Sequence, residues 1–180
     1  MVNQIDFSKK TVLAYIKGVC DGDGWATYCD STKRYEIGLQ NTSKIFVEKF
    51  KHALDSVGKT AFFGKRNKKS WRTAVNGKLL QKWVTEQDVS CFKTDEEIVA
   101  YLEGFYESDG VTKYPCYTKA NKELLENVKR MLKKFEIKSY LEGPYTNNYD
   151  TKYYFLRIAA NSVTKFSKLI NPVEHNEWCK

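Results

Sequence analysis

Two aspartates occupy matching places in this chain, and their carboxylates are suited to hold divalent metal ions. Asp23 lies in residues 16–24 and Asp109 in residues 102–110, and both segments have the form apolar-x-Gly-apolar-apolar-acid-small-Asp-Gly. Each segment closes an apolar stretch and leads into β-rich sequence, so the repeat predicts two facing helices that each deliver one aspartate to a shared place. Two carboxylates held close together outside a core are a natural seat for divalent metals.

Small residues inside the two segments predict how these helices meet. Gly18 and Gly22 are four residues apart, as are Gly104 and Ser108, and residues four apart share one face of a helix. Small residues at this spacing let two helices pack backbone against backbone. A single Asp-Gly-Asp-Gly run is readily explained as a turn after a helix, but two matching runs behind two small-residue helices argue against that explanation.

The helix ends themselves favour a bound cation. A helix dipole is negative at its C-terminus, so an aspartate there is unfavourable, and two side by side are worse unless a cation is present. The carbonyl groups of Gly22 and Ser108 at these ends could add metal ligands. Gly24 and Gly110, which follow the aspartates, are expected to take the left-handed conformation that ends a helix.

Composition narrows the class of protein. The chain has 180 residues, of which 42% are hydrophobic and 14% aromatic, so it suits one large domain or two small ones with a real core. It has no apolar run of the roughly 18 residues that a membrane helix needs, and its first ten residues lack a secretory signal. We therefore expect an intracellular, reducing location, cytoplasmic or organellar, with neither secretion nor membrane attachment.

Cysteine, histidine and charge content restrict the chemistry further. Five cysteines without a C-x-x-C pair argue against a disulfide framework or a zinc site. Two histidines leave little material for a histidine general base. The net charge of +8 suggests a polyanionic partner.

The duplication extends beyond the motif, because residues 43–63 parallel residues 121–141. Two related halves are predicted, 1–92 and 93–180, each running helix, strand pair, helix, strand pair, helix. The predicted helices cover about 9–22, 43–57, 77–85, 95–108, 121–135 and 162–170, and the predicted hairpins pair about 60–66 with 70–75 and 138–145 with 152–160. The fold class is thus α+β, with two pseudo-symmetric αββαββα repeats joined by the paired motif helices.

One strand shows clearly which side chains face outward. Residues 34–40 alternate polar and apolar side chains, so Tyr35, Ile37 and Leu39 are predicted to face the core. The polar residues between them then face the solvent or a ligand. A compact basic cluster at residues 65–69 falls between the two strands of the first predicted hairpin.

In these features the chain resembles the LAGLIDADG homing endonucleases of the single-chain, two-repeat type, whose family name spells the motif. The resemblance implies that the motif helices form the interface between two subdomains and that two antiparallel sheets form a saddle over double-stranded DNA. It implies that Asp23 and Asp109 are the catalytic metal ligands. Mg2+ is then the expected cofactor, Mn2+ is expected to be tolerated, and Ca2+ to support binding without cleavage.

The same resemblance implies a reaction. A site-specific double-strand break with short 3′ overhangs is expected. Because the two halves differ in sequence, the DNA target should be long and asymmetric. A single chain carries both motifs, so we expect a monomer with no obligate protein partner.

Members of that family also place polar or basic side chains around the scissile phosphates. Gln40, at the end of its strand, matches such a position, and Lys119 falls at the equivalent place in the second repeat. Lys113, which shares the outer face of its segment with Tyr117 and Lys119, and Lys44 are further candidates. A solvated residue at a strand edge is the competing interpretation for each.

The motif copies depart from the family pattern at three positions. Lys17 and Glu103 stand where the family has a small residue, and both are expected on outer helix faces. Glu107 replaces the sixth-position aspartate and is expected to be structural. None of these departures removes a predicted metal ligand.

Hairpin strands are expected to enter the major groove on both sides of the DNA centre, as β-ribbons do. Arginine can read guanine there and asparagine can read adenine. The predicted base readers are Tyr28, Arg34, Glu36, Lys68, Arg72, Tyr140, Asn147 and Arg157, with Lys44 and Tyr117 as further DNA contacts. The predicted phosphate contacts, which give affinity without sequence information, are Lys65, Arg66 and Lys69.

Two other functions stay open. Some proteins of this fold act as maturases, which bind intron RNA to assist splicing with or without cleavage, and basic faces suit RNA as well as DNA. A DNA-binding regulator without chemistry is the second alternative, although its paired acids would repel the phosphates they face. An intein endonuclease is not expected, since the chain has no room for splicing domains and begins at Met1.

Overall fold

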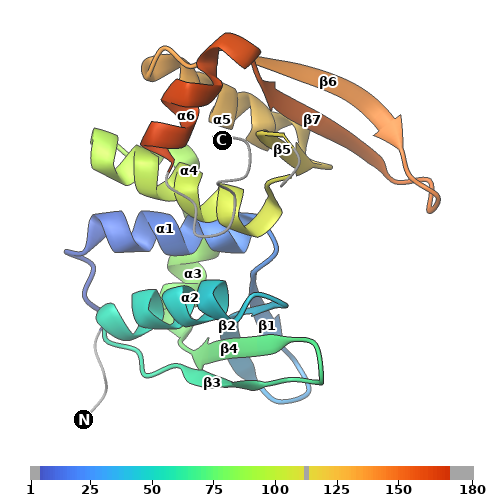
Figure 1. Cartoon of the computed structure of the whole chain (residues 1–180). Helices are drawn as coiled ribbons and strands as arrows, with labels where there is room; N and C mark the ends of the chain where they lie inside the picture. Colours follow the sequence, from blue (N-terminus) through green and yellow to red (C-terminus); the bar gives the residue numbers. More distant parts are fainter. Residues whose placement is uncertain (1–4, 112–113, 171–180) are drawn as a thin grey trace. The chain divides into compact units, whose positions relative to one another are not determined.

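The computed structural model describes residues 5–111 and 114–170 and divides into two compact units, Met1–Ser108 and Asp109–Lys180. Each unit combines helices with an antiparallel sheet (Figure 1). The first unit extends past residue 92 because α4 (Asp95–Asp109) packs on α1 (Lys10–Asp21). The predicted halves 1–92 and 93–180 concern the duplicated sequence and stay a prediction.

The first unit is built on a four-stranded sheet, sheet A, with the strand order β1-β2-β4-β3. Between α1 and α4 the elements are β1 (Trp25–Cys29), β2 (Arg34–Asn41), α2 (Lys44–Ser56), β3 (Phe62–Lys65), β4 (Trp71–Asn76), α3 (Lys78–Glu86) and a short 3-10 turn (Val89–Cys91). Ile37 and Leu39 of β2 are fully buried in the core beneath the helices. The predicted alternation of this strand is therefore confirmed.

The second unit has a three-stranded sheet, sheet B, with the order β5-β7-β6 in the described residues. Its elements are β5 (Cys116–Lys119), α5 (Lys122–Lys134), β6 (Ser139–Thr146), β7 (Lys152–Ile158), a 3-10 turn (Ala160–Ser162) and α6 (Val163–Leu169). Figure 1 shows β6 and β7 as a long hairpin. Leu156 and Ile158 of β7 are buried in the core of this unit.

Local sequence explains where these helices begin and which face they bury. The Ser43 hydroxyl accepts a hydrogen bond from the Phe46 N–H at 3.2 Å, which caps α2. Asn121 caps α5 in the same way at 3.1 Å. Behind the first cap, Phe46, Phe50 and Leu54 recur at helical spacing and are buried.

The predicted αββαββα pattern holds for the first repeat but not for the described part of the second. There the strand pair before α5 is reduced to β5, which Gly110 joins through an isolated bridge to Tyr117. Only residues 111–115 separate Gly110 from β5, whereas residues 25–33 are available for the first strand and turn of sheet A. Pro115 also lacks a backbone N–H for a ladder.

The expected left-handed glycine after the first motif helix is wrong. Gly24 has no left-handed φ, and a Cβ there would lie 2.8 Å from the Val19 carbonyl oxygen and 3.1 Å from the Gly38 oxygen. Gly24 is needed because two backbones approach it closely. The helix ends instead at Gly22, whose N–H donates to the Gly18 oxygen at 3.1 Å.

The predicted backbone contact between the motif helices is confirmed within the first unit. A Cβ on Gly18 would lie 2.2 Å from the Tyr101 carbonyl oxygen, and one on Gly104 would lie 2.4 Å from the Tyr15 oxygen. Any side chain at either glycine would push the two backbones apart. The small residues therefore set the distance between α1 and α4.

Candidate active site

A reciprocal pair of hydrogen bonds fixes the two motif helices against each other. The Tyr15 hydroxyl donates to Glu107 at 2.7 Å, and the Tyr101 hydroxyl donates to Asp21 at 3.0 Å. The tyrosines stand three residues before the two motif glycines Gly18 and Gly104, and the acids three residues after them. Burial, and then the neighbouring Glu107 carboxylate, raises the pKa of Tyr15, so its hydroxyl stays a donor. The sixth-position acids thus hold the helices together.

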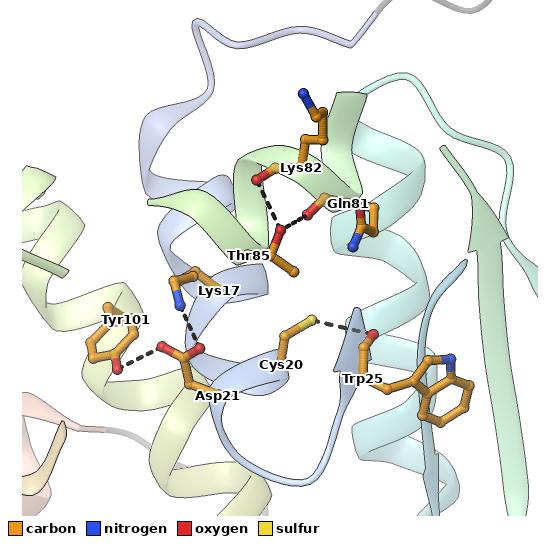
Figure 2. A network of polar contacts seen from close by, with 8 residues as sticks. All are labelled: Lys17, Cys20, Asp21, Trp25, Gln81, Lys82, Thr85 and Tyr101. Atoms are coloured by element: carbon orange, nitrogen blue, oxygen red, sulfur yellow. Dashed lines mark hydrogen bonds and ion pairs between the residues drawn. The ribbon is translucent and has the colours of Figure 1, made fainter. Parts of the chain in front are cut away.

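A lysine completes the contact on each side of the helix pair. Figure 2 shows the Lys17 ammonium paired with Asp21, which also accepts from Tyr101. On the other side Lys49 of α2 lies 2.8 Å from Glu107 and also binds Glu103. Burial favours the neutral form of Lys49, but hydrogen bonds to both glutamates outweigh it and raise the pKa of the ammonium.

The outer-face prediction for Lys17 is wrong, because only 8% of this residue is exposed. Its long side chain folds along the helix to reach Asp21 one turn later. Glu103 is half-buried and pairs with a lysine from another helix. Lys17 and Glu103, which replace the family's small residue, are thus each paired with an opposite charge.

The second unit brings together two of the predicted catalytic residues. The Lys119 ammonium lies 2.9 Å from an oxygen of Asp109, and the two side chains are 25% and 20% exposed. Lys119 ends β5, opposite Tyr154 of β7, while the bridge from Gly110 to Tyr117 ties the end of the motif to the same strand. Lys119 therefore places one positive charge beside the carboxylate of Asp109.

The other predicted catalytic residues lie in different surroundings. Asp23 is exposed just after α1. Gln40 is exposed near the end of β2 and donates to the Ser70 hydroxyl at 3.2 Å. Lys44 pairs with Glu48 and lies over the ring of a neighbouring tryptophan. Lys113 lies outside the described residues.

The donor set fits a hard divalent cation shared with a substrate. Within residues 5–111 and 114–170, no group of three or more His, Cys, Asp or Glu side chains is gathered as a metal site. Mg2+ is usually held by one or two carboxylates together with substrate phosphates, and an all-protein cage is not required. Asp23 and Asp109 each supply a carboxylate of this kind.

Five of the predicted DNA contacts line one hollow on the outer face of sheet A. They are Arg34, Glu36, Lys65, Arg66 and Arg72, and the hollow encloses about 370 Å3. Four of the five are cationic, so the hollow suits an anionic ligand. Lys68 and Lys69 are exposed in the adjoining turn between β3 and β4.

Glu36 and Arg72 form a fixed pair within this hollow. The guanidinium of Arg72 is 2.6 Å from Glu36 and 5.0 Å from the ring of Trp25, and the Trp25 N–H donates to the same glutamate oxygen at 2.8 Å. Gly38 stands opposite Trp25 in the ladder, and a Cβ there would lie 2.3 Å from the indole ring. Sequence reasoning missed Trp25; the signal was a glycine inside a predicted strand.

Tyr28 lies on the other face of sheet A, contrary to the prediction. It stands opposite Tyr35, with the ring centroids 4.6 Å apart. Directly opposed residues share a face, and Tyr35 alternates with the outward Glu36. Neighbouring residues of a strand face opposite sides of the sheet, so Trp25 and not Tyr28 is on the outer face.

Sheet B carries a matching pair on its outer face. The Nε of Arg157 is 2.6 Å from Glu142, and its guanidinium lies 4.7 Å from the Tyr114 ring. The hydrogen bonds to Glu142 and then Tyr114 raise the pKa of Arg157, so it stays cationic. Tyr140, opposite Arg157 in the ladder, is 59% exposed.

Two predicted contacts of the second unit change role. Tyr117 is fully buried and packs edge-on against Phe166, so the prediction that it faces DNA is wrong. It stands opposite Leu156, on the side of β5 that faces the core. The side-chain oxygen of Asn147 accepts two backbone hydrogen bonds at 2.9 and 3.0 Å and thereby shapes the turn between β6 and β7.

No helix in the described part of the chain combines the length and apolar character needed to cross a membrane.

Residues 10–87 and 96–171 each match the family described as LAGLIDADG-like domain. Two uncharacterized proteins of Methanocaldococcus jannaschii are similar: MJ0398, 30% identical over 75% of this chain and 52% of that protein, and MJ0314, 28% identical over 83% and 64%. This chain thus spans between about half and two thirds of the length of these relatives.

Solved structures share the fold. A structure of mesophilic variants of the homing endonuclease I-DmoI has a TM-score of 0.73 at 20% identity, covering 89% of this chain and 95% of that one. I-DmoI in complex with DNA and Mn has a TM-score of 0.72 at 18% identity, covering 89% and 96%. The N-terminal LAGLIDADG domain of DUF199/WhiA has a TM-score of 0.65 at 14% identity, covering 94% and 85%.

Proposed function

This chain belongs to the LAGLIDADG-like domain family, and we propose that it is a site-specific DNA endonuclease that uses a divalent metal to cut both strands. The observation that carries this proposal is the ion pair between Lys119 and Asp109 at the end of a motif helix. In a DNA-binding regulator without chemistry, the motif acids would repel nearby phosphates, so their retention favours a nuclease. The DNA complex of I-DmoI with Mn, a protein of the same fold, supports the choice of DNA and a metal.

The residues that precede the two aspartates lie at one end of the α1–α4 pair. A Cβ on Gly22 would lie 1.7 Å from the Ser108 hydroxyl oxygen, so these two residues are neighbours in the first unit. Asp23 directly follows the first and Asp109 the second. Consecutive Cα atoms are about 3.8 Å apart, so chain connectivity supports a shared site for the two carboxylates.

Asp23 and Asp109 would hold the metal, with the carbonyl oxygens of Gly22 and Ser108 as further ligands. A bound Mg2+ would activate a water and offset the charge on the scissile phosphate. Lys119 adds a fixed cation beside Asp109, which stabilises negative charge on a phosphate oxygen. Gln40 serves as the polar group of the first repeat. Mn2+ is expected to substitute for Mg2+, and Ca2+ to support binding alone.

The two sheets supply binding. The cationic hollow of sheet A, with Arg72 held by Glu36 and Trp25, is suited to guanine recognition, because a guanidinium can bond two acceptors of that base. The exposed lysines and arginine of the β3–β4 turn bind phosphates. Because the two sheets carry different side chains, the target is long and asymmetric. The protein acts as a monomer and leaves short 3′ overhangs.

The test is cleavage of a supercoiled plasmid that carries the uninterrupted locus into which the gene for this chain is inserted. Reactions with Mg2+, with EDTA and with the Asp23→Asn variant run in parallel. We expect linear DNA cut at one site, only with Mg2+ and only with the unaltered acid. Tight DNA binding without cleavage would indicate a DNA-binding regulator instead of a nuclease. Cleavage by the Asp23→Asn variant would overturn the assignment of Asp23 as a metal ligand.

A second function, intron RNA binding by a maturase, is favoured by one observation. Two hollows on the helical side of the second unit are lined by cations around one carboxylate, Glu136: Lys129, Lys133, Lys134, Lys138, Lys165 and Lys168. The hydrogen bond from Lys165 lowers the pKa of Glu136, so the two stay an ion pair. Replacing Lys129, Lys133 and Lys168 with Gln should weaken binding to the intron RNA and leave DNA binding unchanged. Equal RNA binding by both proteins would remove this second function.

A further inference from the structure

A row of aromatic rings covers the outer face of the β6–β7 hairpin. Tyr145 stands opposite Tyr153, and Phe155 follows Tyr153 on the same face. The ring centroids are 5.9 Å apart for Tyr145 and Tyr153, 5.5 Å for Tyr145 and Phe155, and 5.3 Å for Tyr153 and Phe155. Arg157 continues the row, with its guanidinium 5.0 Å from the Phe155 ring.

An irregularity in β6 puts Tyr145 into this row. The ladder shifts by one residue between Glu142 and Tyr145, so two residues of β6, Gly143 and Pro144, oppose one residue of β7. Strict alternation would place Tyr145 on the core side together with Ser139 and Leu141. A bulge re-aims the side chains that follow it, and Tyr145 is accordingly 42% exposed on the outer face.

The chemistry of this face is apolar and close to neutral. Its cation, Arg157, is paired with Glu142, whereas the hollow of sheet A has several cations. The rings of Tyr153 and Phe155 meet at 85°, and those of Tyr145 and Phe155 at 59°. Rings at such angles do not form a flat platform on which unpaired bases could stack, but they leave apolar edges and corners open to a small group.

One group in the major groove of DNA fits such a surface. Thymine alone presents a methyl group there, and phenylalanine is among the side chains that contact it. The position of Arg157 supports DNA as the occupant, because it lies on an inner strand of sheet B as Arg72, which lines the cationic hollow, lies on an inner strand of sheet A. Asn147 is exposed in the turn that follows the rings at the hairpin tip, where it can meet the DNA backbone.

We propose that Tyr145, Tyr153 and Phe155 determine specificity by packing against thymine methyl groups in the half-site bound by the second unit. This inference rests on the proposed function. It assigns apolar readout to sheet B and charged readout to sheet A. The half-site bound by the second unit is therefore rich in A·T pairs at the positions that the three rings reach.

The test replaces thymine with uracil, which removes only the methyl group. The probe is the duplex that the full chain selects from a randomised library, with uracil placed in one half-site at a time. We expect uracil in one half to weaken binding about fourfold for each contacted methyl and uracil in the other half to have little effect. The Phe155→Ala variant, and Tyr153→Leu in case the first fails to fold, should lose that sensitivity. Tyr28→Ala, an exposed ring on the opposite face of sheet A, should keep it.

Each other outcome overturns the inference. Equal binding to thymine and uracil duplexes, or equal sensitivity of Phe155→Ala and the unaltered protein, would show that the rings do not touch methyl groups. A change from dimer to monomer in Phe155→Ala, measured by sedimentation equilibrium, would make this face an interface between copies. If the unaltered protein selects no duplex at all, the proposed function fails first, and this inference with it.

Discussion

The outer faces of the two sheets differ sharply although they arise from one duplicated sequence. Sheet A presents a cationic hollow in which Arg72 is braced by Glu36 and Trp25. Sheet B keeps the arginine and a glutamate but surrounds them with aromatic rings. Both arginines lie on an inner strand of their sheet, but the glutamate partner comes from β2 in sheet A and from β6 in sheet B. The two faces therefore reached an Arg–Glu pair from different strands and surround it with different neighbours.

The acids of the two motifs differ in the same way. Asp109 is paired with Lys119 at 2.9 Å, whereas Gln40 of the first repeat is bonded to Ser70 across sheet A. Lys119 thus lies against the acid of its own repeat, whereas Gln40 contacts a neutral serine. In the proposed nuclease these two residues are the polar groups of the two halves. The two halves are therefore expected to contribute unequally to cleavage.

Substituting Lys119 and Gln40 separately tests whether the two halves contribute unequally to cleavage. These substitutions should give the largest effect on the cleavage rate. Lys119→Met takes away a cation beside Asp109 and should slow cleavage about 100-fold, while Gln40→Ala should slow it much less. Single-turnover rates on the end-labelled target measure both. Equal losses in the two variants would show that the halves contribute alike.

The close packing of α1 on α4 in the first unit can be tested by substituting its glycines. Gly18→Ala sets a Cβ against the Tyr101 backbone and should destabilise the protein by about 3 kcal/mol. Gly22→Ala meets side chains, chiefly that of Ser108 and also the Phe105 ring, and should cost less. Urea denaturation measures both. The double variant Gly22→Ala, Ser108→Gly should regain stability, and no recovery would argue against this contact.

The cationic face should dominate the salt dependence of DNA binding. Replacing Lys65, Arg66, Lys68 and Lys69 with Gln should lower the slope of log affinity against log salt by about 0.9 for each phosphate that is no longer neutralised. The matched control replaces Lys129, Lys133, Lys165 and Lys168 on the helical side of the second unit. A larger change of slope in the control would show that DNA binds to the helical side of the second unit and not to sheet A.

The smallest contrast is between two thiols. Hydrogen bonds, first from Ser31 and then from Thr32, lower the pKa of Cys29 to about 7, and burial raises that of Cys116 to about 11. Because a lowered pKa yields thiolate at neutral pH, iodoacetamide should alkylate Cys29 with a half-maximal rate near pH 7. Mass spectrometry of native protein should find Cys116 unlabelled. Ser31→Ala should move the Cys29 midpoint upward, and an unmoved midpoint would exclude the hydroxyl as its cause.

Sequence reasoning predicted the elements well because their signals are local. The periodic apolar residues of α2 and α5 and the motif spacing at Gly18 and Gly104 each imply one structure. It was harder to predict which face of a sheet each strand side chain occupies. Tyr28 and Tyr117 were misplaced because a strand register is set by partners distant in the chain.

The features that sequence reasoning missed depend on contacts between elements. Lys49 comes from α2, yet it binds two acids of α4. The Trp25 ring lies over Gly38 of the neighbouring strand, where any side chain would displace it. The row of rings on sheet B requires a bulge at Gly143 and Pro144 that alternation alone does not reveal.

The most direct test of a site shared by the two halves is strand-specific cleavage by Asp23→Asn and Asp109→Asn. Each variant is mixed with the target duplex labelled on one strand at a time, with Mg2+, and DNA affinity is measured alongside in Ca2+. A shared site predicts that both variants bind like the unaltered protein and cut neither strand at an appreciable rate. Cleavage of both strands at the unaltered rate by either variant would contradict it.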